Sequence, residues 1–315
     1  MEQTDSFSSC ELCPRRCSVD RSAGRTGVCG VSAELRLARV ALHFWEEPPI
    51  SGEKGSGAVF FSGCPLRCVF CQNHEISSGG FGREVSASRL SAAMLELQAQ
   101  GAHNINLVTA LHYAPKVKQA LLAAKDAGLD LPVVCNTSGY ELVETVEYMA
   151  DVVDVWLPDF KYSDSRLAAS LSGARDYPQV AAAALEAMVA AVDARGGRLM
   201  GEDGLMKRGI IVRHLVLPRH SDDSCAVLDR VWQIAQNRVD LSVMNQYTPN
   251  EQCRRRGGAL AQTLDDLEYE VVLCHADDLG FEHLWWQEGG TVSESFVPAF
   301  DATGVCGDEL GDLRV

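Results

Sequence analysis

The sequence predicts an α/β fold in which a parallel sheet is covered by helices on both faces. Two observations lead to this prediction. Six apolar runs rich in Leu and β-branched residues recur along the 315 residues, as expected for strands buried on both faces. Stretches with apolar residues at helical spacing separate these runs. A chain of this length suits one large domain or two small ones.

The predicted elements alternate regularly along the chain. The strands are expected at residues 58–62, 104–109, 131–136, 152–157, 209–217 and 241–247. The helices are expected at residues 88–100, 115–127, 140–150, 178–195, 223–237 and 263–279. Six units are too few for a closed eightfold barrel and fit an open, partial one, although a doubly wound sheet would give the same pattern. In both arrangements the active site lies at the carboxyl ends of the strands.

Three regions are expected. Residues 1–57 form a Cys-rich N-terminal extension with a possible second metal site, residues 58–284 form the barrel, and residues 285–315 form a tail to which no role is assigned.

The composition narrows the possible partners and the location. The formal net charge of −15 argues against nucleic acid, whose phosphates require a surplus of Lys and Arg. The acidity fits either simple solubility or an acidic docking face. No apolar run approaches the roughly 18 residues of a membrane span, and the first residues do not resemble a secretory signal. We therefore expect a cytoplasmic protein that does not bind membranes.

Twelve cysteines are unusual for such a chain, and seven of them fall in the first 71 residues, in two groups. The chain is too long for a small disulfide scaffold, and clustered cysteines in a reducing compartment are more often metal ligands. The other five are dispersed and are expected to be buried apolar residues. Cys253 is the exception, because three arginines follow it and favour exposure.

Cys64, Cys68 and Cys71 form a C-x3-C-x2-C motif directly after the first predicted strand. From the cysteine frequency, about 0.02 such motifs are expected by chance. Three thiolates on one loop can hold a cubane iron–sulfur cluster and leave its fourth iron open, as a reactive centre requires. A structural zinc site would need a fourth ligand.

This motif matches the signature of the radical S-adenosylmethionine (SAM) superfamily. Over about residues 10–250 the chain resembles, more narrowly, the proteins similar to pyruvate formate-lyase activating enzyme (PflX-like). The segments that carry this resemblance are Cys13–Cys17, Ala41–Pro48, Phe60–Cys64, Cys71–Asn73, Asn104–Thr109, Asn136–Tyr140, Leu157–Tyr162 and Arg213–Pro218.

The resemblance implies a partial (β/α)6 TIM-like barrel with a [4Fe-4S] cluster on the three cysteines and SAM across the strand ends. In this superfamily the amino and carboxylate groups of SAM chelate the open iron. Reductive cleavage of SAM then yields methionine and a 5′-deoxyadenosyl radical, which removes a hydrogen from the substrate. The resemblance further implies an anaerobic setting, a flavodoxin- or ferredoxin-type electron donor, and a glycyl-radical enzyme as the protein substrate.

The same resemblance assigns roles to residues near the strand ends. Phe70 would lie by the adenine of SAM, although a core aromatic is the alternative. Asn136 would contact the ribose, although Asn-Thr-Ser-Gly is also a good turn sequence. Asp159 and Lys161 would contact SAM or substrate, the alternative being a strand-end ion pair. Arg213 would meet the SAM carboxylate, a bidentate contact suited to a guanidinium.

One departure from the superfamily pattern stands after the second predicted strand. Many radical SAM enzymes have a Gly-Gly-Glu-like segment there, which holds the SAM amino group. Here the segment Val108–His112 has no carboxylate, so Thr109 or a backbone carbonyl would have to substitute.

The second cysteine group consists of Cys10, Cys13, Cys17 and Cys29. Four thiolates at these spacings suit an all-cysteine zinc site or a second iron–sulfur cluster, and ligand softness does not separate the two. Free surface thiols are the alternative. The group is interspersed with basic residues that would offset thiolate charge, namely Arg15, Arg16, Arg21 and Arg25.

A further polar segment, with His43, Trp45, Glu46 and Glu47, precedes the barrel. Its His and Glu side chains allow acid–base chemistry, but we expect a linker packed against the barrel. Three functions therefore compete: an activase of a glycyl-radical enzyme, a radical SAM enzyme with another protein or a small-molecule substrate, and a non-enzymatic iron–sulfur or zinc protein that binds partners or transfers electrons.

Overall fold

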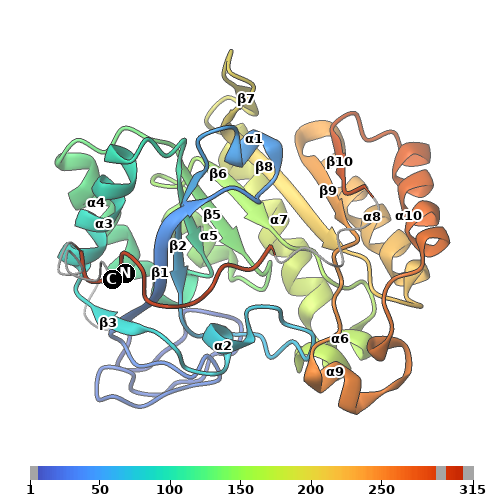
Figure 1. Ribbon diagram of the computed structural model, residues 1–315, viewed down its shortest axis with the longest axis horizontal. Coiled ribbons are helices and arrows are strands. Elements are labelled where there is room, and N and C mark those ends of the chain that lie inside the picture. The colour runs from blue at the N-terminus through green and yellow to red at the C-terminus, as the bar shows by residue number, and fades with distance from the viewer. Residues whose placement is uncertain (1–5, 289–295, 308–315) are drawn as a thin grey trace, which may run out of the picture.

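The computed structural model describes residues 6–288 and 296–307, and its central feature is a curved, mostly parallel sheet (Figure 1). Its parallel strands pair in the order β10-β9-β8-β6-β5-β4-β2. They comprise β2 (Ser56–Phe61), β4 (Ile105–Val108), β5 (Val133–Thr137), β6 (Val155–Pro158), β8 (Met206–Leu215), β9 (Asp240–Met244) and β10 (Leu284–Trp286).

Antiparallel strands extend this sheet. β1 (Leu35–His43) pairs with β2, and β3 (Arg83–Val85) pairs with β1. β7 (Leu199–Met200) pairs with the start of β8.

Helices follow the strands and cover the outer face of the sheet. The longer helices are α3 (Ala87–Ala99), α4 (Ala114–Asp126), α5 (Val143–Met149), α6 (Ser165–Ser172), α7 (Tyr177–Asp193), α8 (Ser221–Ala235) and α10 (Asp266–Leu279). Shorter turns are α1 (Pro48–Ser51), α2 (His74–Ser77), α9 (Glu251–Arg256), η1 (Leu111–Tyr113), η2 (Gln236–Arg238) and η3 (Gly258–Ala261). Within the described residues, no helix has both the length and the apolar character needed to cross a bilayer.

The predicted α/β fold with an open parallel barrel is confirmed. Every predicted strand and helix is present, with bounds that differ by a few residues. β1 and β10 were not expected. β1 lies within the predicted extension of residues 1–57, yet it joins the sheet because Leu35 and Leu37 are fully buried on its core side. The division of the chain at residue 57 stays a prediction.

The two ends of the described chain pack against the barrel. Residues 6–34 contain no helix or strand and lie beside the loops at the carboxyl ends of the strands (Figure 1). Residues 296–307 run along β1, where Val40 donates a backbone hydrogen bond to Thr303 and Ala302 donates one to Ala38. The C-terminal segment therefore reaches the β1 edge, across the sheet from β10.

The turn after β5 shows how tightly the strand ends pack. Gly139 has φ of +74°, and a β-carbon at this position would collide with the backbone carbonyl oxygen of Asp159. The Tyr177 hydroxyl lies 2.8 Å from the Ser138 carbonyl oxygen and 3.0 Å from that of Asp159. The Tyr177 hydroxyl thus links the backbone at the end of β5 to the backbone at the end of β6.

We predict that Gly139→Ala destabilises the protein far more than Gly128→Ala. Both glycines have positive φ, but a β-carbon at Gly128 would meet nothing within 4 Å. The strain of the left-handed conformation costs about 1–3 kcal/mol at either site, and the collision at Gly139 adds about 1–3 kcal/mol more. Urea unfolding of the two variants measures the difference, and equal losses would contradict the packing described here.

Candidate active site

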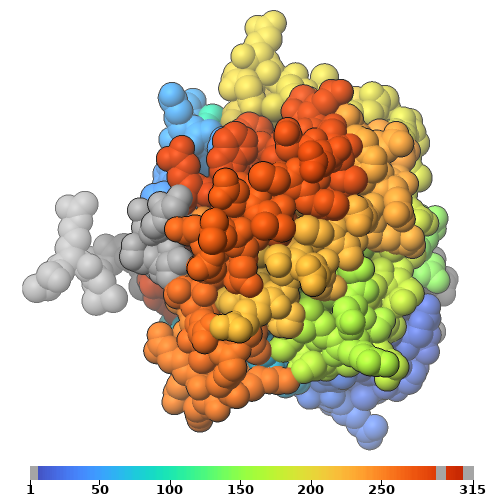
Figure 2. Space-filling model, turned by 90° about the vertical axis from the view of Figure 1, so that its right-hand side faces the viewer, coloured from blue at the N-terminus to red at the C-terminus, as the bar shows by residue number. Residues whose placement is uncertain are grey.

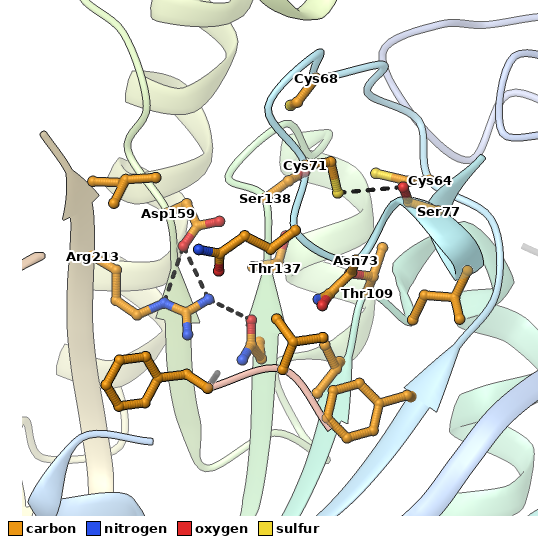
Figure 3. A pocket seen from close by; sticks show the side chains of 18 of the residues that line it. Cys64, Cys68, Cys71, Asn73, Ser77, Thr109, Thr137, Ser138, Asp159 and Arg213 are labelled. Carbon is orange, nitrogen blue, oxygen red and sulfur yellow. Dashed lines mark hydrogen bonds and ion pairs between the residues drawn. The ribbon is translucent and has the colours of Figure 1, made fainter. Parts of the chain in front are cut away.

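A cavity of about 220 Å³ opens at the carboxyl ends of the parallel strands. It brings together all the site residues predicted within the barrel, and Figure 3 labels several of them. They come from the loop after β2 and from the ends of β4, β5, β6 and β8, and are Cys64, Cys68, Phe70, Cys71, Thr109, Asn136, Asp159, Lys161 and Arg213.

The three thiols border one side of this cavity. Hydroxyl groups contact two of them: Ser77 Oγ lies 3.3 Å from Cys71 Sγ, and Ser172 Oγ donates to Cys68 Sγ at 3.0 Å. Burial raises the pKa of Cys64, and the neighbouring Cys68 and Cys71 raise it further. Burial also raises the pKa of Cys71.

These thiols fit an iron–sulfur cluster by their chemistry. They are free, they share one cavity, and Lys161 favours the thiolate forms of Cys64 and Cys71. Within the described residues, no three Cys, His, Asp or Glu side chains stand ready to hold a metal ion as they are placed. Cluster binding would therefore require the thiols to turn toward a common centre.

Opposite the thiols, Arg213 stands at the centre of a buried charge network (Figure 3). Its guanidinium donates to Asp159 Oδ1 at 3.0 Å, to Glu46 Oε2 at 3.1 Å and to Asn136 Oδ1 at 2.6 Å. Burial opposes its charge, but Asp159, Glu47 and Glu46 outweigh burial and raise the pKa of Arg213. His214, the next residue, points elsewhere, and its Nδ1 lies 2.7 Å from the Phe160 carbonyl oxygen.

Asp159 and Lys161 form an ion pair with Nζ 2.6 Å from Oδ2. Burial opposes ionisation of Asp159, but Arg213 and Lys161 outweigh it and hold the pKa of this carboxyl below its usual value. Asp159 in turn keeps Lys161 charged and raises the pKa of its ammonium against the effect of burial. The strand-end ion pair considered from the sequence is therefore present, and it lines the cavity.

Thr109 stands where the superfamily pattern would have a carboxylate. Its φ is +59°, an uncommon conformation for a β-branched residue. Its amide donates to the Asn136 carbonyl oxygen at 2.8 Å, which fixes the end of β4 against β5. Strained backbone of this kind concentrates at functional sites.

Glu46 is the site residue that sequence reasoning missed. The segment of residues 43–47 does pack against the barrel, but the Glu46 carboxylate also lines the cavity. Besides the ion pair with Arg213, its Oε1 accepts hydrogen bonds from Asn106 at 2.9 Å and Asn136 at 3.2 Å. The two adjacent glutamates before the barrel were the available signal. Burial raises the pKa of Glu47, which lies beside this network.

Phe70 belongs to the cysteine loop, and Cys253 of α9 contacts this loop. Phe70 is buried against Tyr162 and Tyr247, with ring centroids 6.3 and 6.2 Å apart, and it also faces the cavity. The expected exposure of Cys253 is wrong, because this residue is fully buried. Its Sγ lies 3.6 Å from the carbonyl oxygen of Val69, inside the cysteine loop.

The N-terminal cysteines lie outside this cavity. They are close to it nonetheless, because the Cys64 amide donates a hydrogen bond of 3.3 Å to the Cys29 carbonyl oxygen. Burial raises the pKa of Cys13 to about 12, with further contributions from Glu141, Cys29 and Cys10.

The fold and the cavity define an open parallel α/β barrel that presents three thiols and a buried charge network at its strand ends. Residues 58–204 match the model of the radical SAM superfamily.

The sequence identities to individual proteins are low. An uncharacterized protein of Methanocaldococcus jannaschii is 28% identical over 252 residues, which are 77% of this chain and 67% of that protein. A radical SAM methyltransferase of Sphaerobacter thermophilus superposes with a TM-score of 0.50 at 13% identity, over 74% of this chain and 67% of its own. SuiB of Streptococcus suis, solved with bound SAM, gives 0.49 at 16% identity over 72% of this chain, which spans about half (48%) of SuiB.

Two buried histidines lead to a prediction about acid stability. Burial, assisted by Arg21, lowers the pKa of His112 to about 3, and burial lowers that of His214 to about 4. The unfolded chain, with histidine pKa values near 6.5, binds more protons than the native state below that pH. Stability is therefore complete above pH 6.5 and is lost as the pH falls, by on the order of 3 kcal/mol per histidine near pH 4.

The measurement is urea unfolding between pH 7.5 and 4.5. His112→Gln and His214→Gln should each flatten the fall in unfolding free energy, and the exposed His74→Gln is the control for loss of a histidine. An unchanged slope in both buried-site variants would contradict the prediction.

Proposed function

We propose that this protein is a radical SAM enzyme that binds a [4Fe-4S] cluster through Cys64, Cys68 and Cys71 and SAM in the adjoining cavity. The observation that carries the proposal is that these thiols and the charged groups of Asp159, Lys161 and Arg213 line a single cavity. When bound, the reduced cluster supplies one electron that cleaves SAM to methionine and a 5′-deoxyadenosyl radical.

The charges in the cavity suit the amino-acid end of SAM. Two acids, Asp159 and Glu46, balance two bases, Lys161 and Arg213. An α-amino acid group carries one charge of each sign, so it can exchange partners with these ion pairs without leaving a buried charge unpaired. Arg213 or Lys161 would meet the carboxylate, and Glu46 would supply the acidic group that is absent from Val108–His112.

The remaining groups suit the nucleoside end. Phe70 offers an apolar surface beside the cysteine loop, and Asn136 offers an amide at the end of β5. Thr109 also lines the cavity. These packed groups would exclude water from the reacting atoms.

The proposed substrate is a protein, as for the activases of glycyl-radical enzymes, where the removed hydrogen is the Cα hydrogen of a glycine. The support for this finer assignment is the resemblance of the segments around Cys17, Glu46, Asn136 and Arg213 to the PflX-like proteins. A radical SAM enzyme with another protein or a small molecule as its substrate would share every feature of the cavity.

We predict that the protein, reconstituted with iron and sulfide without oxygen, produces 5′-deoxyadenosine from SAM and dithionite. Cys64→Ala should lower the yield at least 100-fold, because three ligands are needed to hold the cluster. Cys225→Ala, a half-buried cysteine on α8, is the control and should retain activity. Chromatography measures the product. Its absence, with a reducible cluster visible by electron paramagnetic resonance, would favour an electron-transfer or scaffold protein.

The surface beside the cysteine loop supports an acidic electron donor. α9 carries Arg254, Arg255 and Arg256, all exposed, on a chain whose net charge is −15. Asn250, the N-cap of α9, donates to the Val69 carbonyl oxygen at 2.9 Å, so these arginines are fixed next to the loop that bears the cluster ligands. Figure 2 shows this region as a projecting lobe at the lower left. Complementary charge speeds the encounter of such partners.

We predict that Arg254→Glu/Arg255→Glu lowers the rate of 5′-deoxyadenosine formation driven by reduced flavodoxin about 10-fold or more at low salt. The rate driven by dithionite, a small reductant, should be unchanged. Lys54→Glu/Arg230→Glu changes the charge equally at exposed positions away from this lobe and is the control. Equal losses with both reductants would mean that the arginines support the fold or the cavity instead of the donor.

A further inference from the structure

Arg21 is a buried cation without an acidic partner. It is 1% exposed, and its guanidinium donates to the carbonyl oxygens of His112 at 2.6 Å and Ser32 at 2.8 Å. The rings of Phe7 and Tyr113 lie 5.0 and 5.1 Å from the guanidinium carbon. Among the described residues, no carboxylate forms a salt bridge with it. A buried charge left uncompensated is costly, so a negative group is expected nearby.

The nearest candidates for that negative group are thiols. Arg21 Nη1 lies 3.5 Å from Cys10 Sγ. Cys10, Cys13 and Cys29 are buried, and Cys17 is half-buried. Cys17 Sγ accepts a hydrogen bond from the Val28 amide at 3.4 Å, which joins it to the turn that carries Cys29. None of these cysteines is in a disulfide.

The segment that carries these cysteines lacks regular secondary structure. Residues 6–34 contain no helix or strand. Backbone hydrogen bonds such as Cys10 to Val19 and Arg21 to Phe7 fold it back on itself. Short irregular segments of this kind commonly depend on disulfides or a metal for stability.

We propose that Cys10, Cys13, Cys17 and Cys29 bind a metal centre through four thiolates and that Arg21 is its counter-ion. Four thiolates with Zn²⁺, or with a [4Fe-4S]²⁺ cluster, carry a net charge of about −2. A single nearby cation therefore offsets about half of the charge of either centre. Binding of Zn²⁺, or of a preassembled [4Fe-4S]²⁺ cluster, breaks four S–H bonds, releases four protons to solvent and forms four metal–sulfur bonds, with no change of oxidation state.

The thiols must turn to close this site, because none of the described cysteine groups is arranged around a common point as it stands. The same holds for Cys64, Cys68 and Cys71, so the present side-chain directions do not distinguish the two groups. The backbone is already folded so that Cys10 and Cys29 contribute to the environment of Cys13.

The proposed centre would support the loop of the first cysteine motif. Arg67 of that loop donates to the Val28 carbonyl oxygen at 2.7 Å, and Arg15 donates to the Pro65 carbonyl oxygen at 2.8 Å. With the bond between the Cys64 amide and the Cys29 carbonyl, these contacts join the two cysteine groups through their backbones.

The first test measures metal in the full chain carrying Cys64→Ala, Cys68→Ala and Cys71→Ala, which removes the other cysteine motif. After separate anaerobic loading with Zn²⁺ and with iron plus sulfide, and removal of loosely bound metal, we expect either about one zinc or about four irons with labile sulfide per chain. Further substitution of Cys13→Ser and Cys29→Ser should abolish retention, whereas Cys274→Ser, exposed on α10, should not. No stoichiometric metal with either loading would overturn the proposal.

The second test concerns the counter-ion and uses metal retention against a competing chelator. Arg21→Met should weaken retention at least 10-fold, whereas Arg21→Lys should retain most of it because the charge remains. Cys17→Ser provides a ligand variant at a half-buried position if Arg21→Met does not fold. Equal retention in wild type, Arg21→Met and Cys17→Ser would overturn the assignment. Because neither test measures SAM cleavage, the result is independent of the proposed enzymatic function.

Discussion

The buried ion-pair network around Arg213 is the constraint on which the arrangement of the strand ends depends. A guanidinium at this depth is tolerated because Asp159 and Glu46 neutralise it and Asn136 accepts a further hydrogen bond. These partners come from the end of β6, the segment after β1, and β5. The network therefore fixes the positions of elements that are far apart in sequence, and it places a balanced set of charges at the cavity.

Arg21 and Arg213 differ in how their charge is met. Arg213 has carboxylates on two sides, whereas Arg21 has carbonyl oxygens, aromatic faces and the sulfur of Cys10. Carbonyl dipoles stabilise a cation but do not neutralise it. This contrast is the basis of the proposal that the N-terminal cysteines bind a metal centre.

Local patterns predicted the parallel strands and their helices, because each of these depends on nearby residues. The candidate site residues followed from the cysteine motif and from the resemblance to a known family. Hydrophobic runs identify a buried strand, and the position after it marks the strand end where ligands bind. Glu46 and β1 were missed because their roles depend on contacts that local patterns do not reveal. The role of Glu46 depends on Arg213, which is 167 residues away, and β1 pairs antiparallel outside the regular alternation. The burial of Cys253 beneath exposed arginines likewise depends on the distant loop at Val69.

The cysteine loop is held in place by hydrogen bonds from several neighbouring segments. α9 contacts it at Val69, the N-terminal segment at Cys64 and Pro65, and Ser172 at the end of α6 donates to Cys68. A loop with few internal hydrogen bonds gains its rigidity from these neighbours. A change in the N-terminal segment would consequently reach the three thiols through backbone contacts, without any residue of that segment entering the cavity. The N-terminal segment and the loop that carries the three thiols are therefore coupled through these contacts.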